Sequence, residues 1–299
     1  MRRRAFTLFH LLVLLAVLAI LFALLLPVVA ALREEAARRQ SANNLRQLAI
    51  AAHTYYDANG AFPPGVDDKH FSAAARLLPY IEQDAVYKLI DFTKPVEDKA
   101  NDEARKIIIR TFLNPLDPVR SVTMDAAPTN YLFNAGAKYS LEGNNGIFYL
   151  DSRVKFPEIS DGTSNTLMIG ETLKGDNMVR ATTVKRQHVH LKKDDLKDLT
   201  DDAGVKEWKD DKKIAADRCA AWMDGRFLQG TFTGTRKLND DKPDVDCDGA
   251  GGLSGLRGLR DGANIAMCDG SVRYITSKVS LDGWKALAGR DDGQPIPDF

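Results

Sequence analysis

The sequence predicts an α+β protein in which one long N-terminal helix packs on an antiparallel sheet. An apolar run over residues 5–32 continues, without a turn signal, into a charged helical pattern that ends at Gly60. Short apolar segments separated by Gly- and Asn-rich loops, the pattern of strands, follow between residues 130 and 171 and again at residues 265–275. A helix followed by strands that are close in sequence is typical of the α+β class.

Composition excludes some classes of function. The chain has 299 residues with 41 basic and 41 acidic side chains, and this zero net charge argues against a nucleic-acid binder, which needs a basic excess. The three cysteines, Cys219, Cys247 and Cys268, are too few and too widely spaced for a zinc cage. If this part of the chain is exported, one disulfide with one thiol left over is the simplest expectation, with the pairing left open.

The apolar run has the length of a membrane-spanning helix. Spanning takes about 20 residues, and residues 6–32 supply them. Arg2, Arg3 and Arg4 precede the run and predict a cytoplasmic N-terminus with the rest of the chain outside. Two alternatives are a signal peptide cleaved at the small residues 29–31 and an ordinary single-pass anchor. The predicted organisation is a basic leader (1–5), a transmembrane segment (6–32), its soluble continuation (33–60) and an α+β globular domain (61–299).

The soluble continuation of the helix has an apolar stripe with mostly three- and four-residue spacing, which predicts that it packs on the domain. Gly60 is a helix C-terminal signal, and Pro63 and Pro64 follow it. His53 lies on this half, and we interpret it as a packed or surface histidine rather than a ligand.

The globular part alternates predicted helices, strands and loops. Residues 185–218 form a charge-rich block, predicted to be a solvated helix or an inserted excursion. Asp269 and Gly270 predict a two-residue turn in a hairpin over 265–275. Trp284 is expected to cap the core. Helices are predicted at residues 72–90 (broken by Pro79), 101–112 and 280–288, and strands at residues 130–136, 146–150 and 167–171.

A loop dense in turn-forming residues precedes the last of these strands. Its hydroxyl, amide and carboxylate side chains predict a tight loop bonded to its own backbone, with glycine at positive φ. A catalytic serine is the sharper alternative, but the loop lacks a nucleophile elbow and an evident histidine partner. The residues are Asp161, Gly162, Thr163, Ser164, Asn165 and Thr166.

Two patterns raise the question of a metal. Asp244, Asp246 and Asp248 with the following glycine match the first half of an EF-hand loop, but position twelve is Gly255 instead of a bidentate Glu. A complete EF-hand is therefore excluded, and a looser calcium site stands against an acidic surface turn. His188 and His190 alternate and would share one face of a strand, where nearby aspartates could complete a metal site; a surface position is the favoured interpretation.

The N-terminal segment resembles the class III signal of type IV prepilins and type II secretion pseudopilins. The resemblance rests on the basic leader, Phe6 with the Thr and Leu after it, and the apolar run. It implies cleavage by a prepilin peptidase between Ala5, where the family has Gly, and Phe6, which is then N-methylated. Pro27 stands where the family has a helix-kinking proline. His10 stands where the family has the Glu that pairs with a neighbouring subunit's amine.

The centre and the end of the chain resemble one subgroup of pilin-like proteins, which carries a domain of unknown function and a C-terminal H-x9-DG motif. The loop at residues 161–166, the Gly-Glu pair at 170–171 and the Asp269-Gly270 pair carry this resemblance. Leu259 occupies the position of the motif's histidine.

This resemblance implies a non-enzymatic, single-pass subunit of a type II secretion or type IV pilus-like assembly. Its domain would lie in the periplasm or at the cell surface, and its partners would be the membrane, prepilin peptidase and other pilin-like subunits. Some members use calcium to order C-terminal loops. The alternative is an anchored surface protein that keeps the signal but does not polymerise, which His10 and Leu259 favour. An exported hydrolase is a more distant interpretation.

Overall fold

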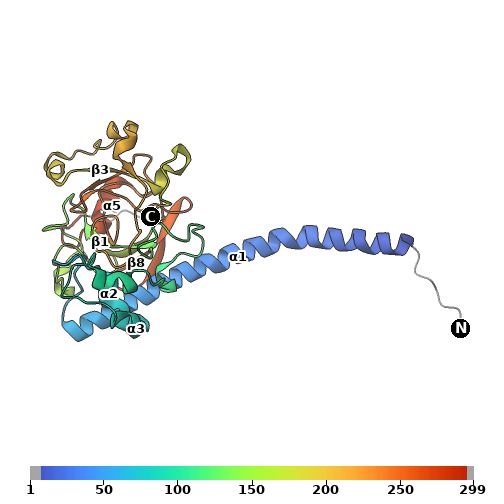
Figure 1. Cartoon of the computed structure of the whole chain (residues 1–299), viewed down its shortest axis with the longest axis horizontal. Helices are drawn as coiled ribbons and strands as arrows, with labels where there is room; N and C mark the ends of the chain where they lie inside the picture. The colour runs from blue at the N-terminus through green and yellow to red at the C-terminus, as the bar shows by residue number, and fades with distance from the viewer. Residues whose placement is uncertain (1–7, 295–299) are drawn as a thin grey trace.

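The computed structural model describes residues 8–294, with backbone alone at residues 8–10 and at isolated positions elsewhere. One helix, α1 (Leu8–Asn59), runs along the globular body for part of its length and projects far beyond it (Figure 1). At about 1.5 Å per residue, a helix of this size is about 80 Å long. The predicted combination of one long helix with a sheet is confirmed, and the fold is α+β.

The two halves of α1 have different surroundings. In the second half Leu45, Leu48 and Ala49 are fully buried against the domain. The helix ends where predicted, because Gly60 adopts φ +74° and its N–H donates to the Tyr56 carbonyl. In the first half the helix continues through Pro27, and Figure 1 shows its axis changing direction within the projecting part. Among the described residues, no helix is long and apolar enough to cross a membrane.

The main sheet has five strands in the order β5 (Thr231–Thr233), β1 (Tyr131–Gly136), β2 (Leu167–Glu171), β8 (Gly262–Met267) and β9 (Val272–Thr276). The predicted antiparallel sheet is wrong in one respect, because β5 pairs parallel to β1 and makes the sheet mixed.

The main sheet separates two hydrophobic cores. Tyr131 and Phe133 of β1 point into the core that includes α1, whereas Leu132 between them points to the other face. There it packs with Trp284 of α5 (Leu281–Ala288), the helix predicted over residues 280–288, whose N-terminus is capped by Ser280. The sheet therefore lies between α1 and α5, with the period-2 alternation expected of a strand buried on both faces.

A second, four-stranded sheet has the order β4 (Ile214–Ala215), β3 (His188–Leu191), β6 (Asp244–Cys247) and β7 (Gly252–Leu253). The charge-rich block supplies β3 and β4, so the alternative of a solvated helix is wrong. Short 3₁₀ turns precede β3 and lie between β3 and β4. They span Ala181–Arg186, Lys193–Asp198, Glu207–Lys209 and Asp211–Lys213.

The remaining helices are shorter than predicted. Pro79 breaks the first one as expected, giving α2 (Ala73–Leu77), a 3₁₀ turn (Leu78–Ile81) and α3 (Asp84–Tyr87). The helix predicted over 101–112 is wrong beyond its first turn. Side chains such as Ile109 and Phe112 are buried from an irregular backbone instead. The elements there are Lys99–Asn101, α4 (Asp102–Arg105) and Arg110–Phe112, and another 3₁₀ turn spans Phe156–Glu158.

Two β predictions need correction. Residues 146–150 are not a strand, because the Gly146 and Phe148 amides fold back onto the Ala135 and Asn134 carbonyls of β1. The hairpin β8–β9 exists, but its turn is not the two-residue Asp269-Gly270 turn. The Met267 carbonyl accepts the Gly270 N–H, and Gly270 at φ +82° takes the left-handed position that closes a three-residue loop.

The predicted disulfide is also wrong. Cys219, Cys247 and Cys268 are all free and buried. They lie in three different hydrophobic clusters, one beneath α5, one under the second sheet and one beneath α1. Each thiol therefore behaves as a small core side chain.

Candidate functional site

A buried polar network fastens α1 to the main sheet. Ser41 of α1 is fully buried, and its Oγ donates to Glu171 Oε2 of β2 at 2.5 Å and lies 3.0 Å from the Tyr131 hydroxyl of β1. The other carboxylate oxygen, Oε1, accepts the backbone N–H of Asn264 on β8 at 2.9 Å. Asn44, one turn along α1, donates to the Leu113 carbonyl at 2.9 Å. Residues of α1, β2 and β8 therefore meet at the Glu171 carboxylate, and β1 joins them through Tyr131 and Ser41.

The protons of this network have a defined order. Because the Ser41 hydrogen is used on Glu171, the Tyr131 hydroxyl is the donor to Ser41. Burial raises the pKa of Tyr131, with Glu171 as a further cause, so the phenol stays protonated at neutral pH. The chain Tyr131 to Ser41 to Glu171 is thus a relay of satisfied hydrogen bonds that orients the helix on the sheet.

The far end of α1 is held by aromatic packing. Tyr56 meets Phe156 edge-on at a ring distance of 4.4 Å, and His53 meets the same ring at 5.5 Å. His53 Nε2 lies 2.9 Å from the Cys268 carbonyl, which can only accept, so Nε2 carries the hydrogen. The interpretation of His53 as a packed histidine is confirmed.

The two segments singled out in the sequence, residues 161–166 and the β8–β9 turn, contact each other. The Asp269 N–H donates to the Thr163 carbonyl at 3.0 Å, and the Cys268 N–H donates to the Thr166 carbonyl at 2.9 Å. Within the loop Gly162 has φ +95°, and Thr166 Oγ1 donates to its carbonyl. The predicted tight, backbone-bonded loop is therefore confirmed.

The same loop also holds the C-terminal segment. Asp161 accepts the N–H groups of Asp292 at 2.8 Å and Gly293 at 3.0 Å. Asn165 donates to the Asp161 carbonyl at 3.1 Å. These contacts give the loop a structural role, joining the start of the central strand β2, the hairpin turn and the chain after α5.

Leu259, at the position of the missing histidine, lies beside the junction of α1 and the sheet. It is 38% exposed and borders an opening of about 400 Å³ between α1 and the start of β8. Arg260, its neighbour, pairs with Glu34 of α1, which also pairs with Arg38 at 3.4 Å. This opening carries ion pairs on its α1 side and Glu171 at its base.

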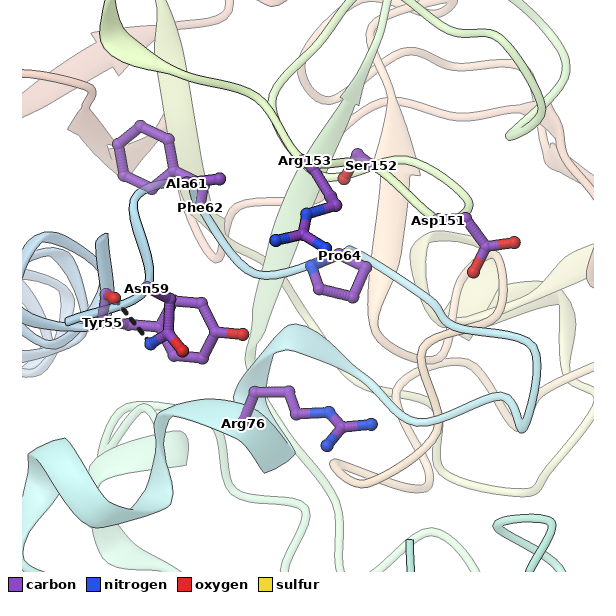
Figure 2. A pocket seen from close by; sticks show the side chains of 9 residues that line it. All are labelled: Tyr55, Asn59, Ala61, Phe62, Pro64, Arg76, Asp151, Ser152 and Arg153. Carbon is purple, nitrogen blue, oxygen red and sulfur yellow. Dashed lines mark hydrogen bonds between the residues drawn. The ribbon is translucent and has the colours of Figure 1, made fainter. Parts of the chain in front are cut away.

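A second opening, of about 470 Å³, lies where α1 ends (Figure 2). Figure 2 shows Arg76 entering from α2 and Arg153 from the segment after Asp151, with Pro64 between them in this view. Arg76 is committed to structure, because it pairs with Asp67 at 2.7 Å and lies 4.0 Å from the Phe92 ring centroid. Of the two guanidinium groups at this opening, that of Arg76 is therefore already held by its own contacts.

The comparisons with known proteins place the chain in a family. The sequence profile of a family described as "Protein of unknown function (DUF1559)" matches residues 30–282. The chain belongs to the DUF1559 family. No curated protein and no solved structure matches the chain.

The DUF1559 match starts within the first half of α1 and ends within α5. It therefore covers the packed half of α1, both sheets and the two contacting segments. Ala5 and Phe6, the predicted processing residues, lie outside the described residues. The kink expected at Pro27 stays a prediction, since the helix is continuous there.

The three aspartates predicted as a calcium half-loop of this DUF1559 chain do not act together. Asp244 is fully buried and binds Arg218 at 2.8 Å and Arg257 at 2.6 Å, so both its oxygens are occupied. Asp244 and Asp246 lie on strand β6 instead of a cation-wrapping loop. Aspartates at alternate positions are common to an EF-hand loop and to one face of a strand, and here Asp244 and Asp246 belong to a strand.

His188 and His190 of β3 lie beside these aspartates. In the parallel pairing of β3 with β6, His188 is opposite Asp244 and His190 is opposite Asp246. His188, His190 and Asp246 each offer a ligand atom within 4.8 Å of the others. Burial lowers the pKa of His188, whereas the hydrogen bond to Asp246 raises that of His190. The favoured surface interpretation is wrong for His188, which is 3% exposed.

Proposed function

We propose that this protein is a membrane-anchored, pilin-like subunit in which the first half of α1 is the anchor and the second half carries the domain. The observation that carries the proposal is the exposed apolar surface of the projecting helix. Its side chains are between 40% and 67% exposed: Leu11, Leu12, Val13, Leu14, Leu15, Val17, Leu18, Ile20, Leu21, Leu26, Val28, Val29 and Leu32.

Such a surface requires a partner. Contiguous exposed apolar patches mark membrane or protein interaction sites, and this one surrounds the helix instead of forming a stripe. A helix that is apolar all round is buried by lipid or by other apolar helices. Both environments occur in a pilin-like life cycle, first in the bilayer and then among neighbouring subunits.

The sequence at the start of the chain supports the same proposal. Three arginines precede an apolar run over residues 5–32, part of which lies outside the described residues. The charge order supports an orientation with the domain on the outer side of the cytoplasmic membrane. The proposal of processing between Ala5 and Phe6 rests on the resemblance to prepilins. The DUF1559 match independently supports the part of the resemblance that concerns the family.

The test is the N-terminus of full-length protein recovered from membranes of cells that contain a prepilin peptidase. The expected product starts at Phe6. A start at Leu32 would indicate an ordinary signal peptide, and Met1 an unprocessed anchor. Two variants separate these cases: Ala5→Glu should abolish cleavage before Phe6, whereas Ala31→Asp should abolish only cleavage after residue 31. Cleavage that survives Ala5→Glu contradicts the proposal.

His10 favours a second candidate, an anchored protein that does not polymerise. A histidine in lipid does not supply the carboxylate charge that pairs with a neighbour's N-terminal amine in the resembling family. Crosslinking of membranes distinguishes the two: a ladder of oligomers supports a filament subunit, and monomer alone supports the stand-alone protein. If missing charge pairing is the reason for monomer, His10→Glu should produce the ladder.

A further inference from the structure

The cluster of His188, His190 and Asp246 lies on one face of the second sheet. The opposite face of β3 and β6 is apolar, formed by Val189 and Val245 in a small hydrophobic cluster. Histidines at alternate positions of β3 therefore share the face on which Asp246 of the neighbouring strand lies. Chain segments 56 residues apart thus meet at His190 Nδ1 and Asp246 Oδ2, which are 3.3 Å apart.

Two buried atoms beside this cluster have no partner. Within the described part of the chain, His188 Nδ1 and Asp217 Oδ1 are shielded from solvent and make no hydrogen bond. They belong to side chains that face each other, with His188 Nε2 3.6 Å from Asp217 Oδ1. A buried unsatisfied group in a native fold calls for a water or an ion.

The local charge favours a cation. Asp217, Asp246 and Asp248 pair only with histidines among the ion pairs of the described residues, whereas Asp244 already binds Arg218 and Arg257. His190 lies between two of these carboxylates, with Nδ1 3.3 Å from Asp246 and Nε2 3.1 Å from Asp248.

We propose that His188, His190 and Asp246 bind a divalent transition-metal cation of the zinc type and so clamp β3 onto β6. Two imidazole nitrogens and one carboxylate are ligands that suit zinc and its neighbours, whereas calcium requires six or more oxygens. The cation binds His188 through Nδ1, and the Nε2–H then donates to Asp217, the outer carboxylate that orients such a ligand. Asp248 or a water completes the coordination.

The geometry requires only a small adjustment. Ligand atoms around tetrahedral zinc are about 3.3 Å apart, so atoms up to 4.8 Å apart must approach by about 1.5 Å. His190 already lies 3.3 Å from Asp246, and its side chain, which is 52% exposed, can move with the cation toward His188. Asp246 stays fixed, because its Oδ1 accepts the Gly249 N–H at 2.9 Å while Oδ2 faces His190. The clamp joins the charge-rich excursion to the body of the domain.

The test titrates ZnCl₂ into the full-length protein, purified in detergent without a histidine tag and freed of metal by dialysis. One equivalent of zinc is expected to bind and to raise the unfolding temperature. His190→Gln should raise the Kd for zinc by about 100-fold or more. Even the loss of a residue that only hydrogen-bonds to a metal ligand lowers metal affinity 10- to 100-fold. The exposed position of His190 keeps the variant folded, which its circular dichroism verifies.

His70→Asn is the matched control. His70 is a half-exposed histidine with its own carboxylate, Glu97, at 3.5 Å, and asparagine tolerates its φ of +68°. This variant should keep the zinc affinity of the parent. The proposal is overturned if the parent binds no zinc, or if His190→Gln and His70→Asn bind it equally. CaCl₂ that binds the same residues more tightly than ZnCl₂ overturns the choice of cation.

Discussion

Asp117 and Asp244 are buried carboxylates that each bind two basic side chains. Asp117 lies 2.9 Å from Arg186 and 3.4 Å from Lys174, and Asp244 binds Arg218 and Arg257. A buried ion pair adds little stability over an apolar substitute, but removing one partner leaves an uncompensated charge. The packing of the segments that carry these ion pairs therefore depends on both partners being present.

The first prediction concerns Asp244. Asp244→Asn leaves Arg218 and Arg257 buried beside a neutral amide, and we expect it to lower the free energy of unfolding by about 3–5 kcal/mol. The control is Asp202→Asn, which removes a carboxylate that is 79% exposed beside Lys242 and should cost less than about 1 kcal/mol. Urea denaturation of both variants gives the comparison, and equal losses would contradict the assigned role.

The second prediction concerns acid. Burial alone would raise the pKa of Asp117 and Asp244, but the neighbouring cations outweigh it and hold both pKa values below the usual one. A carboxyl with a lowered folded pKa contributes stability above its unfolded pKa of about 3.9, and loses it as pH falls through the folded value. The urea midpoint should therefore drop steeply below about pH 4, and less steeply in Asp244→Asn.

Sequence could place these residues but not their partners. The spacing of Asp244, Asp246 and Asp248 is visible in the chain, and it predicted a calcium half-loop. What decides the role of Asp244 is Arg218 from the end of the charge-rich block and Arg257 from beyond β7. Contacts between segments that are distant in the chain depend on the strand pairing, which no local pattern specifies.

At the scale of elements, α1 is the best-predicted part of the molecule. Its apolar stripe, its continuity and its end at Gly60 all follow from local signals. Strands β1 and β2 and helix α5 were predicted for the same reason. The predictions for residues 146–150 and 101–112 were wrong. The backbone amides of the first segment bond to carbonyls of β1 instead of forming a strand, and most of the second segment forms irregular turns instead of a continuous helix.

The third prediction concerns how α1 is fastened. Ser41→Ala removes a donor to the buried Glu171 and the acceptor of the Tyr131 hydroxyl, and we expect a loss of about 1–3 kcal/mol. Hydrogen exchange should rise in the packed half of α1. Asn43→Ala, on the exposed face of the same helix, is the control and should change stability little. A similar effect of both variants would show that helix propensity, not the network, is responsible.

At the scale of the whole molecule, the projecting half of α1 and the domain have opposite surface properties. The domain surrounds two apolar cores with polar loops, whereas the helix exposes leucines and valines. The sequence predicted this division from hydropathy alone. It could not predict the second sheet, since β3, β4 and β7 are two to four residues long and lie among charged or glycine-rich segments.

The fourth prediction follows from that division. Leu18→Asp with Leu21→Asp places two charges in the exposed apolar half, and we expect most of the protein to leave the membrane fraction. Ile50→Asp is the matched control, because Ile50 is also exposed on α1, at 57%, but lies beside the domain. Carbonate extraction and fractionation measure both variants. Membrane retention of the double variant would contradict the proposed anchor.

The Ser41–Tyr131–Glu171 network also has a mechanical consequence. Because α1 lies along the sheet and is bonded through Ser41 to Glu171 of β2 and Tyr131 of β1, a pull between helix and domain loads these contacts in parallel as shear. The aromatic cluster around Phe156 resists at the other end of the same interface. The domain and α1 should therefore move under tension as one rigid body. No flexible linker separates them, because α1 is continuous from Leu8 to Asn59.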